Sequence, residues 1–254
     1  MKIQDLASVV WGLDWVGCSP WQRVVVAALV TAAFTVLARW VRGVSRSGAV
    51  AGAVICFLLY LGVGPAAFLA LVSVFALTWI TTHLGYQQKQ KLGTAEKKEG
   101  RTALQVLANL GVAAVCAGGY AVSVRPVLLL AIAAALAEAA ADTVSSELGQ
   151  ATSQKTRLIT TWEEVSAGTD GGVSVAGTIS GIAAAAVVSA VCALCGLVSW
   201  RWFGITLTAA VVGMFADSFL GAWLERRHVL NNDAVNFLST LLAAAGAVAI
   251  QFWG

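Results

Sequence analysis

The chain has 254 residues, of which 59% are hydrophobic and 11% are charged, and its formal net charge is +3. Soluble domains have about 25% charged residues, so this composition excludes an ordinary soluble globule, a disordered tail and a nucleic-acid-binding module. A membrane-spanning helix needs about 20 apolar residues, and the apolar content is sufficient for about eight such spans. We therefore predict an all-α fold, a polytopic transmembrane helical bundle.

Residues 1–20 are predicted to form a short segment ahead of a single membrane domain at residues 21–254. Ile3, Leu6 and Val10 recur at helical spacing, but the segment is too polar to cross a membrane. This pattern is typical of an amphipathic helix that lies in the membrane interface. The first residues also lack the apolar core of a secretory signal. We therefore expect the protein in the cytoplasmic (inner) membrane of a prokaryote.

Eight apolar segments make up the membrane domain. Tryptophans stand near many of their ends, as in the aromatic belts of membrane proteins. The expected spans are Gln22–Arg39, Ser47–Gly62, Pro65–His83, Thr102–Ser123, Pro126–Ser145, Val173–Ser199, Phe203–Trp223 and Ala234–Trp253.

The distribution of Lys and Arg predicts the orientation. Twelve of these residues lie in the loops that follow odd-numbered segments, and four lie on the other side. The positive-inside rule then places the odd loops in the cytoplasm and both termini outside. The main cytoplasmic loops are expected at residues 84–101, 146–172 and 224–233. The lysines of the first loop are expected to attract anionic lipid and to set the topology. They are Lys89, Lys91, Lys97 and Lys98.

Acidic residues inside apolar helices are costly and mark functional sites by default. The sequence has three, namely Glu138, Asp142 and Asp217. At a rise of ~1.5 Å per residue, Asp142 and Asp217 lie roughly 24 Å from the outer ends of their helices. This depth near the cytoplasmic side favours a site that is open to cytosolic ligands over a transport site at the midplane.

The two helical aspartates have similar contexts. Asp142 and Asp217 each follow an alanine and precede a hydroxyl residue, and each is followed by a polar turn with a further aspartate, Asp170 or Asp233. The pattern is compatible with a degenerate internal repeat, although short matches of this kind also arise by chance. Four carboxylates near one membrane face would repel one another without cations. Hard oxygen ligands of this type suit Mg²⁺. The alternative is helix capping by Asp170 and Asp233 and structural hydrogen bonding by the other two.

Two further patterns suit phosphate. The glycine-rich stretch Gly168–Thr178 precedes a helix, and such a turn presents free backbone N–H groups to an anion, although its glycines would also permit close helix packing. It matches neither a Walker A loop nor a dinucleotide-binding fingerprint. Arg101, Gln105 and Asn109 are spaced by four and form one polar helix stripe. Lys and Arg, here also Lys155 and Arg157, are the usual partners of phosphate groups.

Five blocks of the sequence resemble the integral-membrane family named domain of unknown function ninety-two, whose best-understood type is phytyl-phosphate kinase of tocopherol salvage. The likeness runs from about residue 30 to the C-terminus. A fainter likeness, carried by Asp142-Thr143, Gly149 and Lys155-Thr156, is to the CTP-dependent dolichol and phytol kinases. The five blocks are GRTALQVLAN at 100–109, AAADTVSSELG at 139–149, RLITTWEEVSAGTDGGVSVAGT at 157–178, ADSFLGAWLE at 216–225 and NNDAVNFLST at 231–240.

The resemblance implies a membrane kinase. It would transfer the γ-phosphoryl group of a nucleoside triphosphate, with CTP the first choice, to a phytyl or geranylgeranyl type of prenyl monophosphate and so form the diphosphate. The implied cofactor is Mg²⁺, and the implied partners are the nucleotide, the prenyl phosphate and membrane lipids. The oligomeric state stays open.

The candidate site residues divide by role in this interpretation. The catalytic residues are Asp142, Asp170, Asp217, Asp233 and Arg101. The residues that bind nucleotide or phosphate are Lys155, Arg157, Thr160, Thr161, Gly168, Thr169, Gly171, Gly172, Ser174, Gln105, Asn109, Asn232, Asn236 and Ser239. The metal ligands are Asp142, Asp170, Asp217, Asp233, Ser145 and Glu147.

Two other functions remain open at this point. A CTP-dependent cytidylyltransferase or a lipid-alcohol kinase would use the same metal and nucleotide residues with a different acceptor. A transporter of a small or lipid-linked anion would fit an internal repeat and glycine-interrupted helices, but its acidic residues should lie nearer the membrane midplane.

Overall fold

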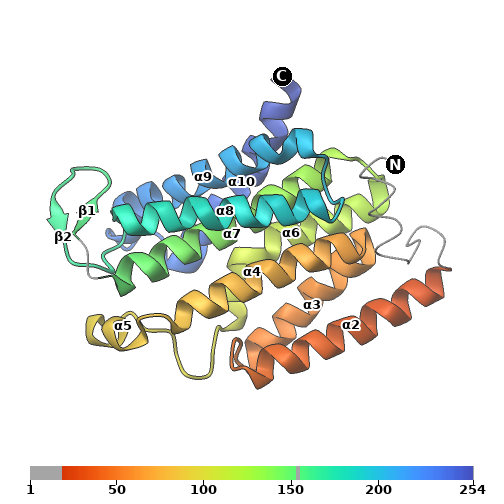
Figure 1. Ribbon diagram of the computed structural model, residues 1–254, viewed down its shortest axis with the longest axis horizontal. Coiled ribbons are helices and arrows are strands. Elements are labelled where there is room, and N and C mark those ends of the chain that lie inside the picture. Colours follow the sequence, from red (N-terminus) through yellow and green to blue (C-terminus); the bar gives the residue numbers. More distant parts are fainter. Residues whose placement is uncertain (1–18, 153–154, 254) are drawn as a thin grey trace.

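The structure is a computed structural model that describes residues 19–152 and 155–253 (Figure 1). The predicted interfacial helix at residues 1–20 lies almost entirely outside the described residues. Within them, eight helices are long and apolar enough to cross a membrane, as the sequence predicts. They are α2 (Pro20–Trp40), α3 (Arg46–Val63), α4 (Pro65–His83), α6 (Ala103–Ser123), α7 (Val127–Ala151), α8 (Val175–Leu194), α9 (Phe203–Leu220) and α10 (Asn232–Trp253).

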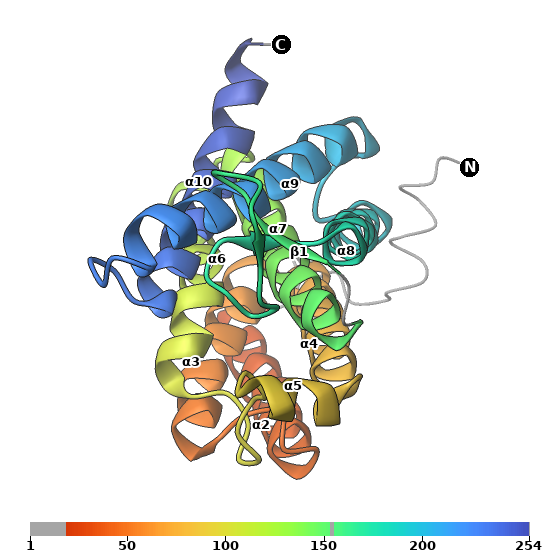
Figure 2. The ribbon, with the colours of Figure 1, turned by 90° about the vertical axis from the view of Figure 1, so that its left-hand side faces the viewer.

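Helix α7 is the centre of the bundle. It contacts α4, α6, α8, α9 and α10, and Figure 2 shows it in their midst. Every residue from Leu130 to Ala141 is buried. Most of these residues are alanine, whose small side chain lets neighbouring helices approach closely. A helix that is apolar on all sides belongs in a core, so the acidic residues of α7 face protein rather than lipid.

The longest predicted loop is partly helical. Helix α7 continues to Ala151, about two turns beyond the predicted end at Ser145, so residues 146–151 belong to the helix and not to the loop. The polar residues after Ser145 interrupt the apolar pattern but are compatible with a helix, so the predicted span ended too early. A small sheet of order β2-β1-β3 follows, with both pairings antiparallel. Its strands are β1 (Thr156–Leu158), β2 (Glu164–Val165) and β3 (Gly172–Val173).

Two other short elements were not predicted. Helix α5 (Tyr86–Leu92) occupies the loop after α4, and the π-helical turn Gly221–Glu225 ends α9. In Figure 1, α5, the sheet and the α9–α10 link lie at one end of the bundle, which we call the polar end. The start of α2 lies at the opposite end, and the end of α10 projects from the top of the view, away from the polar end. The grouping of the loops agrees with the predicted topology, and the side of the membrane that they face stays a prediction.

Candidate active site at the polar end

An acidic cavity opens where α7, the π-helical turn and the glycine-rich loop meet. Its volume is about 170 Å³. Ten of the candidate site residues line this cavity, although they come from segments far apart in the sequence. The predicted residues that line it are Asp142, Ser145, Gly168, Thr169, Asp170, Gly171, Gly172, Ser174, Asp217 and Asn232.

Hydroxyl groups of α10 hold two carboxylates of this region. Ser239 Oγ donates to Asp217 Oδ2 at 3.1 Å, and Thr240 Oγ1 donates to Glu138 Oε2 at 3.0 Å. Asp142 and Asp217 lie close enough for their carboxyl groups to interact electrostatically. Three helices, α7, α9 and α10, therefore converge on one acidic cluster.

Two further acidic residues, Glu138 and Glu225, join this cluster, and the sequence analysis assigned neither of them a role in the site. Glu138 is almost completely buried one turn before Asp142, and its Oε1 has no hydrogen-bond partner among the described residues. Glu225 lines the cavity and lies within electrostatic range of Asp170, Asp142 and Asp233. The spacing of Glu138 and Asp142 by four on an apolar helix was a usable signal. The sequence signal for Glu225 was weaker: it lies about two helical turns after Asp217.

No ion pair neutralises the six carboxylates of this acidic cluster in the part of the chain that the structure describes; the ion pairs found there use Glu147 and Glu164. The cluster consists of Glu138, Asp142, Asp170, Asp217, Glu225 and Asp233. Packed like charges repel, so the arrangement suits a cation from outside the protein.

The donor set is compatible with Mg²⁺. This ion commonly uses one or two carboxylates and completes its shell with water and substrate phosphates. Residues 19–152 and 155–253 contain no group of three acidic, His or Cys side chains already arranged around one metal position. The residues therefore fit a metal that arrives with a triphosphate better than a metal enclosed by protein alone. Asp142 and Asp217 are the best placed to hold it, with Asp170 and Glu225 facing the same cavity.

The capping alternative for the loop aspartates is wrong. The N-cap of α8 is Ser174, whose Oγ accepts from the N–H of Gly177 at 3.1 Å. At the start of α10, Asn231 Oδ1 accepts from the N–H of Ala234 at 2.9 Å, and Asp233 lies inside the first turn. Neither aspartate is needed to satisfy a helix terminus.

The glycine-rich turn packs tightly against the π-helical turn. Gly171 has φ 74°, and a Cβ there would lie 2.6 Å from the backbone N and 2.7 Å from the Cα of Ala222. Only glycine adopts this conformation readily and leaves this space. The contact places Asp170 beside Glu225 at the edge of the cavity.

Replacing Gly171 by alanine should therefore destabilise the protein by about 1–3 kcal/mol and lower activity, because the turn that carries Asp170 must move. Gly196→Ala is the matched control, since Gly196 has φ 75° and a Cβ there would meet nothing within 4 Å. Thermal unfolding and activity of the two variants check this prediction. Equal loss in both would mean that backbone strain, and not the contact with Ala222, is responsible.

A second, larger cavity lies on another side of α7. Its volume is about 420 Å³, and apolar side chains of α2, α3, α4 and α6 form most of its wall. Ala139 and Thr143 of α7 also line it, so α7 forms part of the wall of both cavities. Charged and polar side chains also line it, and we call this part of the wall its mouth; they include Arg42, His83, Glu96, Lys97, Lys98, Arg101, Gln105 and Asn109. We call it the apolar cavity.

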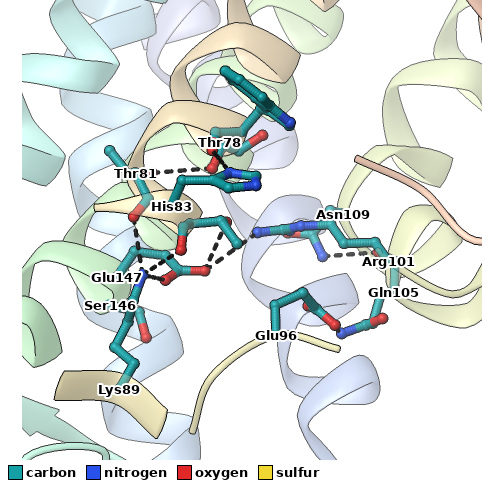
Figure 3. Close-up of polar contacts among 12 residues, drawn as sticks. Thr78, Thr81, His83, Lys89, Glu96, Arg101, Gln105, Asn109, Ser146 and Glu147 are labelled. Atoms are coloured by element: carbon teal, nitrogen blue, oxygen red, sulfur yellow. Dashed lines mark hydrogen bonds and ion pairs between the residues drawn. The ribbon is translucent and has the colours of Figure 1, made fainter. Parts of the chain in front are cut away.

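The predicted polar helix stripe is only partly correct: Gln105 and Asn109 lie on α6, whereas Arg101 precedes the N-cap Thr102 and is bridged to Val44. All three residues, labelled in Figure 3, line this mouth. Gln105 Nε2 donates to Glu96 Oε2 at 3.1 Å, and Asn109 Nδ2 donates to the carbonyl oxygen of Gln105 at 2.9 Å. Arg101 is also close enough to interact electrostatically with Asp142. Arg101 therefore links the apolar cavity to the acidic cluster.

The backbone of Arg101 is clamped by the turn between α2 and α3. Its N–H donates to the carbonyl of Gly43 at 3.2 Å, and its carbonyl accepts from the N–H of Ser45 at 2.9 Å. Gly48 packs directly against the same carbonyl, where a Cβ would overlap it. The guanidinium thus extends from a fixed point.

Several predicted residues lie outside both cavities. Lys155 and Arg157 are exposed beside or on β1, where Lys155 pairs with Glu164 at 3.8 Å. Thr161 donates to Glu163 in the adjoining turn. Of the described residues predicted to bind phosphate or metal, those that line neither cavity are Lys155, Arg157, Thr160, Thr161, Asp233, Asn236, Ser239 and Glu147.

Two predictions about the charged residues near α5 need correction. Lys89 does not face lipid: it is completely buried and pairs with Glu147 at 2.5 Å. Glu147 in turn belongs to this ion pair and not to the acidic cluster. The cause is the fold of α5, which reverses the chain after α4 and directs Lys89 inward.

The comparison with protein families agrees with this architecture. Residues 29–244 match the family model described as "Integral membrane protein DUF92". The chain belongs to this family. No solved structure matches this DUF92 chain.

Relatives of this DUF92 protein occur in archaea, cyanobacteria and plants. An uncharacterised membrane protein of Methanocaldococcus jannaschii is 30% identical over 236 residues, which cover 90% of this chain and 94% of the relative. An uncharacterised membrane protein of Synechocystis is 30% identical over 199 residues, 76% of this chain and 77% of the relative. The chloroplastic protein VTE6 of Arabidopsis thaliana is 30% identical over 222 residues, 83% of this chain and 66% of the relative.

Proposed function

We propose that this DUF92 protein is a membrane phosphotransferase that transfers the γ-phosphoryl group of a nucleoside triphosphate to a prenyl monophosphate. The observation that carries the proposal is the arrangement around α7. An acidic cavity and an apolar cavity share this helix as a wall, and Arg101 lines one while acting electrostatically on Asp142 in the other.

The acidic cavity suits the nucleotide. A nucleoside triphosphate would arrive with bound Mg²⁺, whose positive charge offsets the negative charge of the cluster. Asp142 and Asp217 would hold the metal. When bound, Mg²⁺ neutralises charge on the phosphates. The glycine-rich turn beside Asp170 offers backbone N–H groups and hydroxyls to the same phosphates.

The apolar cavity suits the acceptor. Its wall can hold a hydrocarbon chain, and its mouth carries Arg42, Lys97, Lys98 and Arg101, which can bind a phosphate monoester. A phosphate oxygen of the acceptor would attack the γ-phosphorus, and the bond from that phosphorus to the β-γ bridging oxygen would break. The nucleoside diphosphate leaves and a prenyl diphosphate forms. The attacking oxygen is already anionic, so the step needs no strong general base.

The finer assignments rest on family membership. The resemblance to the phytyl-phosphate kinase type supports a phytyl or geranylgeranyl acceptor, CTP as donor and a role in tocopherol or related isoprenoid metabolism. We place the polar end in the cytoplasm of a prokaryotic inner membrane, because twelve of the sixteen Lys and Arg residues lie in the loops assigned to that side.

A direct assay tests the proposal. Purified protein in detergent would be incubated with Mg²⁺, each γ-labelled nucleotide in turn and phytyl, geranylgeranyl or farnesyl monophosphate. We expect label in the prenyl diphosphate with one nucleotide preferred. If phytol or geranylgeraniol, offered instead, is converted to a labelled monophosphate, the protein is a lipid-alcohol kinase. If the lipid takes up label only from an α-labelled nucleotide, the protein is a cytidylyltransferase. Neither transfer nor nucleotide binding would make an anion transporter the better interpretation.

A further inference from the structure

Lys89 is a completely buried lysine whose position the proposed reaction does not explain. Its Nζ donates to the carbonyls of Thr81 at 3.0 Å and Thr82 at 2.7 Å and to Glu147 Oε2 at 2.5 Å. Figure 3 shows the lysine rising from α5 into this group. An ammonium group has three protons to donate, so Lys89 is fully satisfied and is not available to a ligand.

Glu147 stands between two cations but is bound to only one of them. Its Oε2 is taken by Lys89, and its Oε1 accepts from Thr82 Oγ1 at 2.8 Å. The guanidinium of Arg101 is 3.9 Å from Oε1, which is beyond hydrogen-bond distance. The charge of the carboxylate is therefore neutralised mainly by the lysine.

This division leaves the donors of Arg101 unused. No hydrogen bond to its guanidinium occurs in residues 19–152 and 155–253, although the side chain lines the mouth of the apolar cavity. A guanidinium that forms a tight bidentate pair with a carboxylate must break that pair before it can bind phosphate in the same way. A guanidinium held at 3.9 Å has no such pair to break.

We propose that Lys89 is an internal counterion that retains Glu147 and thereby leaves Arg101 free to bind the phosphate headgroup of a single-chain lipid in the apolar cavity. Lys89 and Glu147 are thus positioning residues, because they act on the ligand only through Arg101. The inference rests on the proposed function for the identity of the ligand. Without Lys89, Arg101, at 3.9 Å, would be the nearest cation to Glu147 and could close on it to form the missing pair.

The test measures equilibrium binding of labelled geranylgeranyl monophosphate to purified protein without nucleotide. In Lys89→Met we expect the Kd to rise about tenfold, which corresponds to about 1.4 kcal/mol. In Lys89→Met/Glu147→Gln, where the competing carboxylate is gone, the Kd should return to within about threefold of wild type. Lys89→Arg keeps the charge and should bind more tightly than Lys89→Met. A wild-type Kd in Lys89→Met, or no recovery in the double variant, would overturn the inference.

A ligand without phosphate gives a matched control. Geranylgeraniol has the same chain but no headgroup for Arg101, so its Kd should not change in Lys89→Met. A rise for both ligands would mean that the variant distorts the cavity, and the counterion inference would be wrong. Inorganic phosphate alone should compete weakly, since it lacks the chain; equal competition would identify a free phosphate site instead.

A second variant serves if Lys89→Met yields no folded protein. Thr82→Val removes the hydroxyl that holds Glu147 Oε1 but leaves every charge in place. The freed oxygen should pair with Arg101, so the Kd should rise about threefold and should recover in Thr82→Val/Glu147→Gln. An unchanged Kd in Thr82→Val would contradict the inference.

The binding test and the transfer assay can fail separately. If no nucleotide supports transfer but the variants change lipid phosphate binding as expected, the proposed function is wrong and the counterion inference stands. If transfer occurs and Lys89→Met binds the lipid normally, the proposed function stands and the inference is wrong. If the wild-type protein does not bind the lipid phosphate at all, both are wrong.

Discussion

Asp142→Asn is expected to reduce turnover about 10³-fold while it raises the thermal stability of the ligand-free protein. Activity falls because the substitution removes a carboxylate from the proposed metal position, where charge stabilisation supplies most of the catalysis of phosphoryl transfer. Stability rises because the carboxylate is buried near Glu138, Asp217 and Glu225, and the attraction of Arg101, which forms no ion pair with it, does not offset that cost. A relief of about 1 kcal/mol corresponds to about 2–4 °C in Tm for a chain of this size.

The measurement combines the transfer assay with thermal unfolding in detergent, each with and without Mg²⁺. Glu163→Gln is the matched control, because it makes the same change of charge at an exposed position outside both cavities. That variant should keep activity within about twofold and the same Tm. Wild-type turnover in Asp142→Asn would remove this residue from the site. Lost activity together with a lower Tm would indicate a structural role instead.

Arg101→Ala is expected to lower kcat/KM about 10³-fold, the lower end of what an arginine contributes to phosphoryl transfer. The KM for the lipid phosphate should rise, since Arg101 lines the apolar cavity, and kcat should fall, since the residue also faces the acidic cluster. Arg101→Lys should recover only part of the loss, because lysine cannot form a bidentate contact with phosphate. Separate determination of kcat and KM for both substrates checks these expectations.

Arg46→Ala is the control for this series. Arg46 is exposed in the first turn of α3 and lines neither cavity, so its loss should leave kcat and KM within about twofold. Unchanged kinetics in Arg101→Ala would contradict its placement between the substrates. A higher KM for the lipid phosphate with an unchanged kcat would confine Arg101 to lipid binding.

Much of the candidate site could be predicted because its residues are chemically out of place in the sequence. Asp142 and Asp217 stand in apolar helices, and Asp170 stands in a glycine-rich turn. The structure places all three at one cavity. Glu138 has the same signal, yet its participation depends on a hydrogen bond from Thr240, which lies 102 residues away. A contact of that range leaves no local pattern.

The basic residues were less predictable for a physical reason. Lys89 and Lys155 both lie in polar stretches of the sequence. Lys89 is completely buried, whereas Lys155 is exposed. The difference arises from the direction that the chain takes after α4. Gly85 adopts φ 63° and packs against Ala151 of α7, and this turn carries α5 back onto the bundle.

The sequence by itself determined the number and order of the spans and the clustering of the candidate site residues toward one end. These properties follow from the length of apolar runs and the position of polar residues within them, and both are local. Only the tertiary structure decided that α7 is the shared wall of two cavities and that Glu147 binds Lys89. It also decided that Arg101 lies between the acidic cluster and the apolar cavity. Such facts depend on how each helix is rotated against its neighbours, and that rotation results from packing across the whole bundle.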